Sequence, residues 1–137
     1  MGARYFADTF YWIALVHPKD SWHGRIIAWA ASHPSAHLVT TTEVLTEVLN
    51  WFATKGPAGR ALASAAVRTI RADTSIQVLP PAGADFDAAL TLYEARPDKT
   101  HSLTDCRTML AMKSQGLTEV LTHDHHFTQE GFTILFT

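Results

Sequence analysis

The sequence predicts an α/β fold, an α/β/α sandwich with a mainly parallel central sheet. Short runs rich in β-branched and aromatic residues alternate with longer segments of helical periodicity, and such alternation is typical of a parallel sheet covered by helices. The length of 137 residues is typical of one domain and allows a substantial core. No linker-like stretch or internal repeat divides the chain. We therefore expect a single domain over residues 1–137.

The expected strands are short apolar runs bounded by turn residues, and they cover residues 4–8, 37–40, 75–80, 118–122 and 132–136. The expected helices have apolar residues at helical spacing, and they cover residues 9–16, 21–32, 40–55, 58–72, 85–95 and 102–115. Each strand is followed by a helix or a pair of helices until the last two strands. This order favours parallel pairing.

Local signals set the helix boundaries. The first helix stops at His17-Pro18, and Ser21 is the expected N-cap of the second. Gly56 and Gly116 mark the ends of the helices over 40–55 and 102–115. In the helix over 40–55, the side chains expected to face the core are Val44, Leu45, Val48, Leu49 and Phe52.

The composition limits the classes of function. The formal net charge is −2 and the isoelectric point about 6.4, without the positive excess of a generic duplex-DNA binder. A polyanionic partner would therefore meet a local basic cluster or bound cations. Cys106 is the only cysteine, so no intramolecular disulfide can form, which fits a reducing cytosol. No signal peptide or membrane helix is recognisable, and we expect a soluble cytoplasmic protein.

Acidic residues from distant parts of the chain are expected at one edge of the sheet. In a parallel sheet, ligand sites lie outside the carboxyl ends of the strands. Asp8 ends the first strand and Asp124 follows the fourth. Glu43 and Glu47 lie on the first turns after the second strand, and the helix that carries Asp105 in its first turn starts at the same edge.

Such a cluster is suited to a divalent cation. Like charges this close repel, and one or more carboxylates would have to take up a proton. Mg²⁺ and Mn²⁺ prefer carboxylate and water oxygens and would remove that cost. One or two such ions can activate water and stabilise the leaving oxygen in phosphodiester cleavage. The sequence thus points to Mg²⁺, with Mn²⁺ as an alternative, and to a nucleic-acid substrate.

Each acid also has a structural explanation. Asp8 and Asp124 can open turns, and Asp105 completes a capping box that begins at Ser102. Thr40-x-x-Glu43 is also a capping box, and we favour this structural explanation for Glu43. Glu47 has no such explanation. The joint placement at one edge is what favours a site.

The stretches FADTFYWIAL, VTTTEVLTEVLN, DKTHSLTDCRTMLAMKSQGLTEVLTHDHHF and GFTIL follow one another in this order. With these motifs and spacings, nearly the whole chain resembles the PIN-domain family. The resemblance is strongest to the small VapC-like ribonucleases, which act as toxins of type II toxin–antitoxin pairs. It implies a parallel-sheet α/β/α sandwich and a metal-dependent endoribonuclease that leaves a 5′-phosphate and a 3′-hydroxyl.

The resemblance also implies roles for individual residues. The invariant acids of the family fall, in chain order, on Asp8, Glu47, Asp105 and Asp124. The three aspartates would bind Mg²⁺ or Mn²⁺ directly, and Glu47 directly or through water. Thr9 and Thr104 are the hydroxyl residues expected to support the site. His101 departs from the family pattern, because relatives often carry tryptophan there.

Contacts with partners are expected at two places. Arg96, Lys99 and Arg107 flank the start of the helix over 102–115 and are the candidate RNA contacts. The resemblance implies a homodimer and an antitoxin helix bound in a groove. The candidate for this interface is an apolar surface on the first two helices, formed by Trp12, Trp22, Ile26 and Trp29.

Three alternatives stay open. A phospho-acceptor signalling domain also gathers acids at the carboxyl edge of a parallel sheet, but it needs adjacent acids after the first strand, where only Asp8 is present. A PIN-like module could bind RNA without cutting it. The histidines His123, His125 and His126 invite a zinc site, but neighbouring residues of a strand point in opposite directions. We favour a solvated loop or an RNA contact for them.

Overall fold

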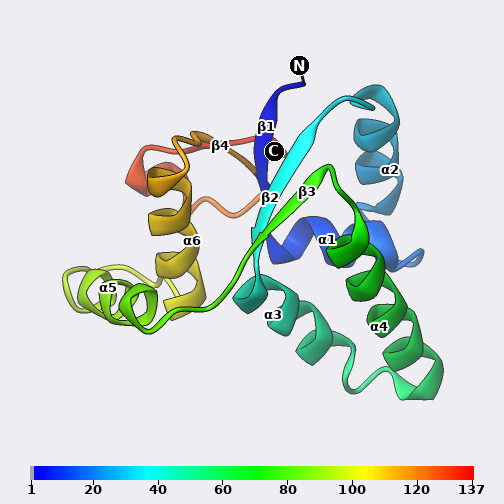
Figure 1. Cartoon of the computed structure of the whole chain (residues 1–137), viewed down its shortest axis with the longest axis horizontal. Coiled ribbons are helices and arrows are strands. Elements are labelled where there is room, and N and C mark those ends of the chain that lie inside the picture. The colour runs from blue at the N-terminus through cyan, green and yellow to red at the C-terminus, as the bar shows by residue number, and fades with distance from the viewer. Residues whose placement is uncertain (1) are drawn as a thin grey trace.

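The computed structural model describes residues 2–137, which fold into a sheet covered by helices on both faces (Figure 1). The strands are β1 (Arg4–Ala7), β2 (His37–Thr41), β3 (Ile76–Leu79), β4 (Glu119–Leu121) and β5 (Thr133–Ile134). The helices are α1 (Thr9–Val16), α2 (His23–Ser32), α3 (Thr42–Phe52), α4 (Gly56–Ala72), α5 (Gly83–Glu94) and α6 (Leu103–Ser114), and a 3₁₀ turn, η1, covers Thr128–Glu130.

Within residues 2–137 the five strands form one sheet in the order β3-β2-β1-β4-β5, and all neighbouring strands are parallel. The predicted fold class is confirmed. The chain builds the sheet outward from β1 in one direction through β2 and β3, and then in the other through β4 and β5. The strand order therefore reverses between β1 and β4, and ligands of open α/β sheets bind at such a reversal, beyond the carboxyl ends of the strands.

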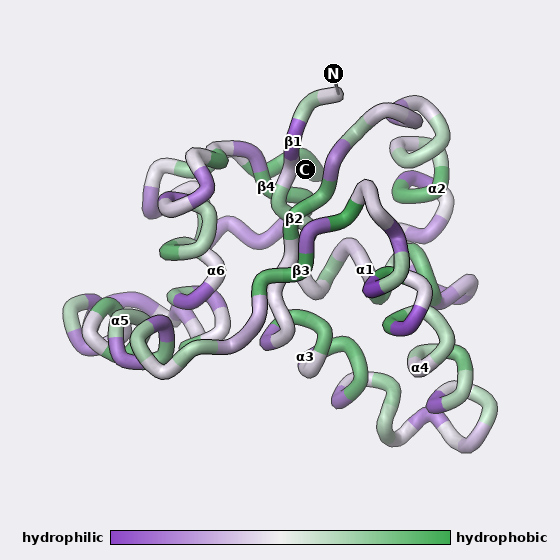
Figure 2. Tube along the Cα trace, in the orientation of Figure 1, coloured by the Kyte–Doolittle hydropathy of each residue, from purple (hydrophilic) through white to green (hydrophobic). Residues whose placement is uncertain are grey.

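The crossover helices divide between the two faces of the sheet. Figure 1 shows α1, α2 and α4 on one side of the strands and α5 and α6 on the other. The buried core lies between these layers and includes Phe6 and Val120 on the central strands, Val48 on α3 and Met112 on α6. In Figure 2, hydrophilic and hydrophobic stretches alternate along α4 and α5, which is the pattern of helices with one face in solvent.

Two predicted helix boundaries and one predicted core residue are wrong. Helix α2 begins at His23, and the turn before it is closed by Asp20, which accepts a hydrogen bond from the Trp22 amide (2.8 Å), rather than by Ser21. Gly56 does not follow a helix end but begins α4, with a φ of 78° that favours glycine. Leu49 was expected in the core but is 39% exposed.

The N-cap of α3 is Thr41, whose hydroxyl accepts a hydrogen bond from the Val44 amide (3.1 Å), and not Thr40. The Thr40 hydroxyl instead connects β2 to β1 and to α1, because it donates to the Ala7 carbonyl (2.9 Å) and accepts from the Trp12 indole (3.3 Å). The predicted capping box that begins at Thr40 is therefore wrong.

The apolar surface predicted on the first two helices is largely internal. Trp12 and Ile26 are 2% and 0% exposed, and Trp22 and Trp29 pack against the same core. The indole of Trp22 stacks on His123, and that of Trp29 stacks on His33. Helical spacing identified the apolar face correctly, but this face covers the sheet rather than a partner. No helix within residues 2–137 has the length and apolar character that crossing a membrane requires.

Candidate functional site

A cavity of about 680 Å³ opens at the carboxyl edge of the sheet, where the strand order reverses. All four acids predicted for the site line it: Asp8, Glu47, Asp105 and Asp124. Thr9, which was predicted to support the site, also lines it, together with Thr122 and three histidines of the loop after β4. The four acids come from four different segments of the chain, so the topology alone brings them together.

Asp8 lies directly between β1 and α1 and is 7% exposed. The pKa of its carboxyl group is raised to about 7, mainly by burial and also by the nearby charges of Asp105 and Glu47. The Thr9 amide and the Thr122 hydroxyl act in the opposite direction. Thr122 follows β4, whose last residue is paired with Ala7 in the sheet. Thr122 was not predicted as a site residue, because its place beside Asp8 depends on this register.

Glu47 projects from α3, one turn after Glu43. Its carboxylate accepts a short hydrogen bond from the Thr9 hydroxyl. Burial and the charge of Asp105 raise the pKa of Glu47, and hydrogen bonds from Thr9 and Thr104 partly offset this effect. Both hydroxyl residues predicted to support the site therefore contact the same carboxylate.

Asp105 caps helix α6 and also lines the cavity. It is the third residue of α6, and the predicted capping box is confirmed. The Asp105 amide donates to the Ser102 hydroxyl (3.0 Å), and the Ser102 amide donates to Oδ2 of Asp105 (3.0 Å). The Asp105 carboxylate nonetheless lines the cavity, so it can cap the helix and face a bound group at the same time.

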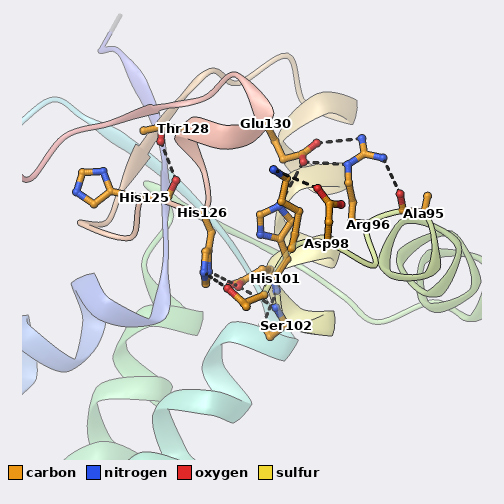
Figure 3. Close-up of polar contacts among 12 residues, drawn as sticks. Ala95, Arg96, Asp98, His101, Ser102, His125, His126, Thr128 and Glu130 are labelled. Atoms are coloured by element: carbon orange, nitrogen blue, oxygen red, sulfur yellow. Dashed lines mark hydrogen bonds and ion pairs between the residues drawn. The ribbon is translucent and has the colours of Figure 1, made fainter.

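Asp124 lies in the loop after β4, and this loop also carries histidines, which were not predicted to bind a metal ion. Oδ1 of Asp124 accepts a hydrogen bond from the His126 amide (2.9 Å). The imidazole of His126 thereby turns toward the start of α6, while the ring of His125 lies on the other side of the loop (Figure 3). The His126 side chain is 29% exposed, but its Nδ1 atom is buried, so the interpretation of the cluster as a solvated loop or an RNA contact stays a prediction.

The donor set fits a divalent cation. One ligand atom each from Asp105, Asp124 and His126 lies within 4.8 Å of the others. Asp8 and Glu47 add two carboxylates to the same cavity, and within residues 2–137 no lysine or arginine lines it. A carboxylate such as Asp8, which retains a proton up to neutral pH without a cation, would release it on binding one.

The three cations predicted to contact RNA lie outside the cavity. Arg96 forms two hydrogen bonds with Glu130 (3.0 and 3.1 Å), and Lys99 lies 3.6 Å from Asp98. Arg107 is 6% exposed. Its guanidinium donates to Glu43 (2.7 Å) and lies 3.5 Å from Asp85. This burial argues against an RNA contact through Arg107, and it explains Glu43 as an ion-pair partner rather than as a cap.

Comparisons with known proteins agree with this architecture. Among solved structures, the chain is similar to the sarcin–ricin-loop-cleaving toxin VapC20 of Mycobacterium tuberculosis, with a TM-score of 0.82 and 25% identity over 93% of this chain and 95% of that one. It shares the fold of VapBC2 from Rickettsia felis, solved with a DNA fragment from its promoter (TM-score 0.67, 7% identity, coverage 96% and 97%). It also shares the fold of PAE2754 from Pyrobaculum aerophilum (TM-score 0.60, 20% identity, coverage 98% and 90%).

No curated protein sequence matches the chain significantly. The sequence profile of the PIN domain, in contrast, matches residues 5–132, which is nearly the whole chain. The chain belongs to the PIN-domain family.

Proposed function

We propose that this chain is a Mg²⁺- or Mn²⁺-dependent endoribonuclease that hydrolyses phosphodiester bonds of RNA. The observation that carries the proposal is the convergence of four carboxylates on one cavity at the reversal point of a parallel sheet. Asp8, Asp105 and Asp124 would hold the ion, and Glu47 would bind it directly or through water. When bound, the ion supplies activated water and neutralises charge on the phosphate. Residues 1–137 would act as one nuclease domain.

The protein side of the site is organised around fixed carboxylates. The hydroxyls of Thr9 and Thr104 hold the Glu47 carboxylate, and the Thr122 hydroxyl and Thr9 amide hold that of Asp8. Such contacts fix the orientation of ligands before the substrate arrives, which keeps the cost of reorganisation low. The cavity is open to solvent on one side and lined by polar groups, so a flexible RNA strand can approach it.

RNA is the proposed substrate, and a toxin–antitoxin pair is the proposed context. VapC20 cleaves the sarcin–ricin loop and resembles this chain over almost its full length, while the VapBC2 structure comes from a toxin–antitoxin assembly bound to DNA. We therefore propose that the chain is a type II toxin of the cytoplasm, forms a homodimer and is neutralised by an antitoxin protein. Arg96 and Lys99 stay candidate RNA contacts, with the Arg96 guanidinium held by Glu130.

The test is cleavage of single-stranded RNA by the purified protein with excess Mg²⁺ or Mn²⁺. Asp105→Asn keeps the shape of the side chain and removes its charge, and we expect the rate of cleavage to fall at least about 100-fold. Asp87→Asn is the matched control, because Asp87 is an exposed acid on α5 away from the cavity. Products are examined for a 5′-phosphate and a 3′-hydroxyl.

Cleavage by Asp105→Asn at the wild-type rate would contradict the proposed active site. Binding of RNA without metal-dependent cleavage by the wild-type protein would favour the alternative of a PIN-like module that binds RNA without cutting it. Membership of the PIN-domain family already argues against a phospho-acceptor signalling domain.

A further inference from the structure

One imidazole nitrogen in the site has no hydrogen-bond partner in the protein. Nδ1 of His126 is buried and makes no hydrogen bond with residues 2–137. It lies 3.2 Å from Oδ1 of Asp124 and 3.5 Å from Oδ2 of Asp105. A buried polar atom without a partner is costly, and its presence calls for an explanation. Here the nitrogen faces the two carboxylates that the proposed function assigns to a metal ion.

The separations of these three atoms match those of ligands around one small cation. Neighbouring ligand atoms of an octahedral ion with bonds of about 2.1 Å lie about 3 Å apart. Nδ1 lies close to this distance from both carboxylate oxygens, and all three ligand atoms fall within 4.8 Å of one another. A single cation among these atoms could therefore bind all three of them.

The second nitrogen of the ring has a defined partner. Nε2 of His126 lies 2.7 Å from the Thr100 hydroxyl. Metal-binding histidines usually donate this second N–H to a neighbouring group, which fixes the tautomer that presents a lone pair to the ion. If Nε2 carries the proton and donates it to Thr100, Nδ1 is free to bind.

The ring is also held in place by packing. His101, 5% exposed, lies edge-on to His126 with ring centroids 5.2 Å apart, and Nε2 of His101 is 3.3 Å from Glu130. Arg96 holds the same Glu130 carboxylate. Figure 3 shows His101, Glu130 and Arg96 on one side of His126. His101, which departs from the family pattern, thus supports a ring that points into the site.

We propose that Nδ1 of His126 is a metal ligand, and that it gives the site a preference for first-row transition dications such as Mn²⁺ over Mg²⁺. The inference rests on the proposed function, because it concerns the same metal site. Imidazole nitrogen binds first-row transition ions well, whereas Mg²⁺ prefers oxygen ligands. Thr100 is a positioning residue that acts through the His126 ring.

A purely electrostatic role of His126 leads to the opposite expectation. An imidazolium would lie between Asp105 and Asp124 as an ion-pair partner and would compete with any cation for the two carboxylates. Removing it would then increase the affinity for both Mn²⁺ and Mg²⁺. The two roles therefore differ in the sign of one measurable change.

The experiment measures Mn²⁺ binding to the purified protein at pH 8 by the loss of the electron paramagnetic resonance signal of free Mn²⁺, with Mg²⁺ as competitor. We expect His126→Ala to weaken Mn²⁺ binding by about 100-fold and Thr100→Val by about tenfold. The affinity for Mg²⁺ should change by about threefold at most. His37→Ala is the matched control and should leave Mn²⁺ affinity unchanged, because His37 is an exposed histidine at the start of β2 and does not line the cavity.

A spectroscopic measurement on the wild-type protein is independent of the folding of any variant. Electron spin echo envelope modulation of bound Mn²⁺ should show coupling to an imidazole nitrogen. His126→Gln should abolish this coupling, and His37→Ala should retain it. Absence of nitrogen coupling in the wild type, or tighter binding of both ions by His126→Ala, would overturn the proposal.

Asp105→Asn separates this inference from the proposed function. If Asp105→Asn loses Mn²⁺ binding while His126→Ala binds like the wild type, only the role of His126 is refuted. If Asp105→Asn and Asp124→Asn both bind Mn²⁺ like the wild type, the metal site itself is refuted and the inference falls with it.

Discussion

Two groups of charged residues lie on the same pair of helices and differ in whether their charges are compensated. In the first group, Glu43 of α3 and Arg107 of α6 form an ion pair with an N–O distance of 2.7 Å. In the second group, Glu47 lies one turn further along α3, and Asp105 lies two residues before Arg107 on α6. These two carboxylates face the cavity, which no lysine or arginine of residues 2–137 lines.

The two glutamates of α3 show what this difference does. Burial by itself raises the pKa of both carboxyl groups. For Glu43 burial is the largest single effect, but the hydrogen bonds from Arg107, from the Glu43 amide and from Thr42, together with the charge of Arg107, outweigh it, so the pKa of Glu43 is lowered. For Glu47 the charge of Asp105 adds to the effect of burial, and its pKa is raised. A single helical turn thus separates a carboxylate that stabilises the fold from one that is suited to a bound cation.

Exchanging each glutamate for glutamine should separate these roles most strongly. We expect Glu47→Gln to reduce RNA cleavage at least about 100-fold, which corresponds to about 3 kcal/mol of transition-state stabilisation. Glu43→Gln should leave the rate of cleavage unchanged and lower the free energy of unfolding, because it weakens the bond to Arg107. Cleavage rates and urea unfolding of both variants provide the measurement. Equal loss of activity in both would remove the distinction.

The second prediction concerns the ion pair between Glu43 and Arg107. Arg107→Ala leaves Glu43 and Asp85 without their cation, and we expect the free energy of unfolding to fall by about 2–3 kcal/mol. The loss stays below that of a fully buried pair, because the Glu43 side chain is 31% exposed. In a double-mutant cycle with Glu43→Gln, the two losses should be less than additive. Additive losses would show that the pair is not coupled.

The third prediction concerns the pH dependence of stability that comes from Asp8, one of the carboxylates of the cavity. The pKa of Asp8 is raised from 3.8 to about 7 by burial and by its acidic neighbours, so the folded state binds more protons than the unfolded state between these values. The metal-free protein should therefore lose stability as the pH rises from about 4 to about 7. Between about pH 5 and pH 7 its free energy of unfolding should fall by about 2 kcal/mol. Comparison with Asp8→Asn in urea unfolding isolates this contribution from the lowered pKa of Glu43, which acts in the opposite direction.

Saturating Mn²⁺ provides the control for the pH experiment. A cation bound to the folded state stabilises it, and it should favour the ionised form of Asp8. The fall in stability between pH 5 and pH 7 should therefore become smaller for the wild-type protein. In Asp8→Asn only the part that comes from the raised pKa of Glu47 should remain. A pH profile of the wild type that Mn²⁺ leaves unchanged would count against metal binding near Asp8.

The sequence predicted the parts of the molecule that depend on chain order. The parallel sheet was predictable from the alternation of strands and helices, and the location of Asp8 and Asp124 followed from their positions directly after strands. The Ser102–Asp105 cap was predictable because its two residues are close in sequence. The catalytic and metal-binding roles of the four acids stay predictions.

The features that were missed depend on contacts between distant segments. Glu43 and Arg107 are 64 residues apart, and no local pattern connects them. Helical spacing showed that Trp12 lies on an apolar face, but only the packing of α1 on the sheet shows that this face is covered. The orientation of His126 is set by its amide bond to Asp124 and by Thr100, both of which require the folded loop.

The smallest expected effect tests whether Asp105 combines two roles. Ser102→Ala removes the hydroxyl that accepts from the Asp105 amide, but the backbone amide of residue 102 can still donate to the Asp105 carboxylate. We expect the free energy of unfolding to fall by about 1 kcal/mol, as for loss of an N-cap. The affinity for Mn²⁺ should change little, because the carboxylate keeps its position. A loss of Mn²⁺ binding as large as that of Asp105→Asn would mean that the cap and the metal site cannot be separated, and that the hydroxyl itself holds the carboxylate in place.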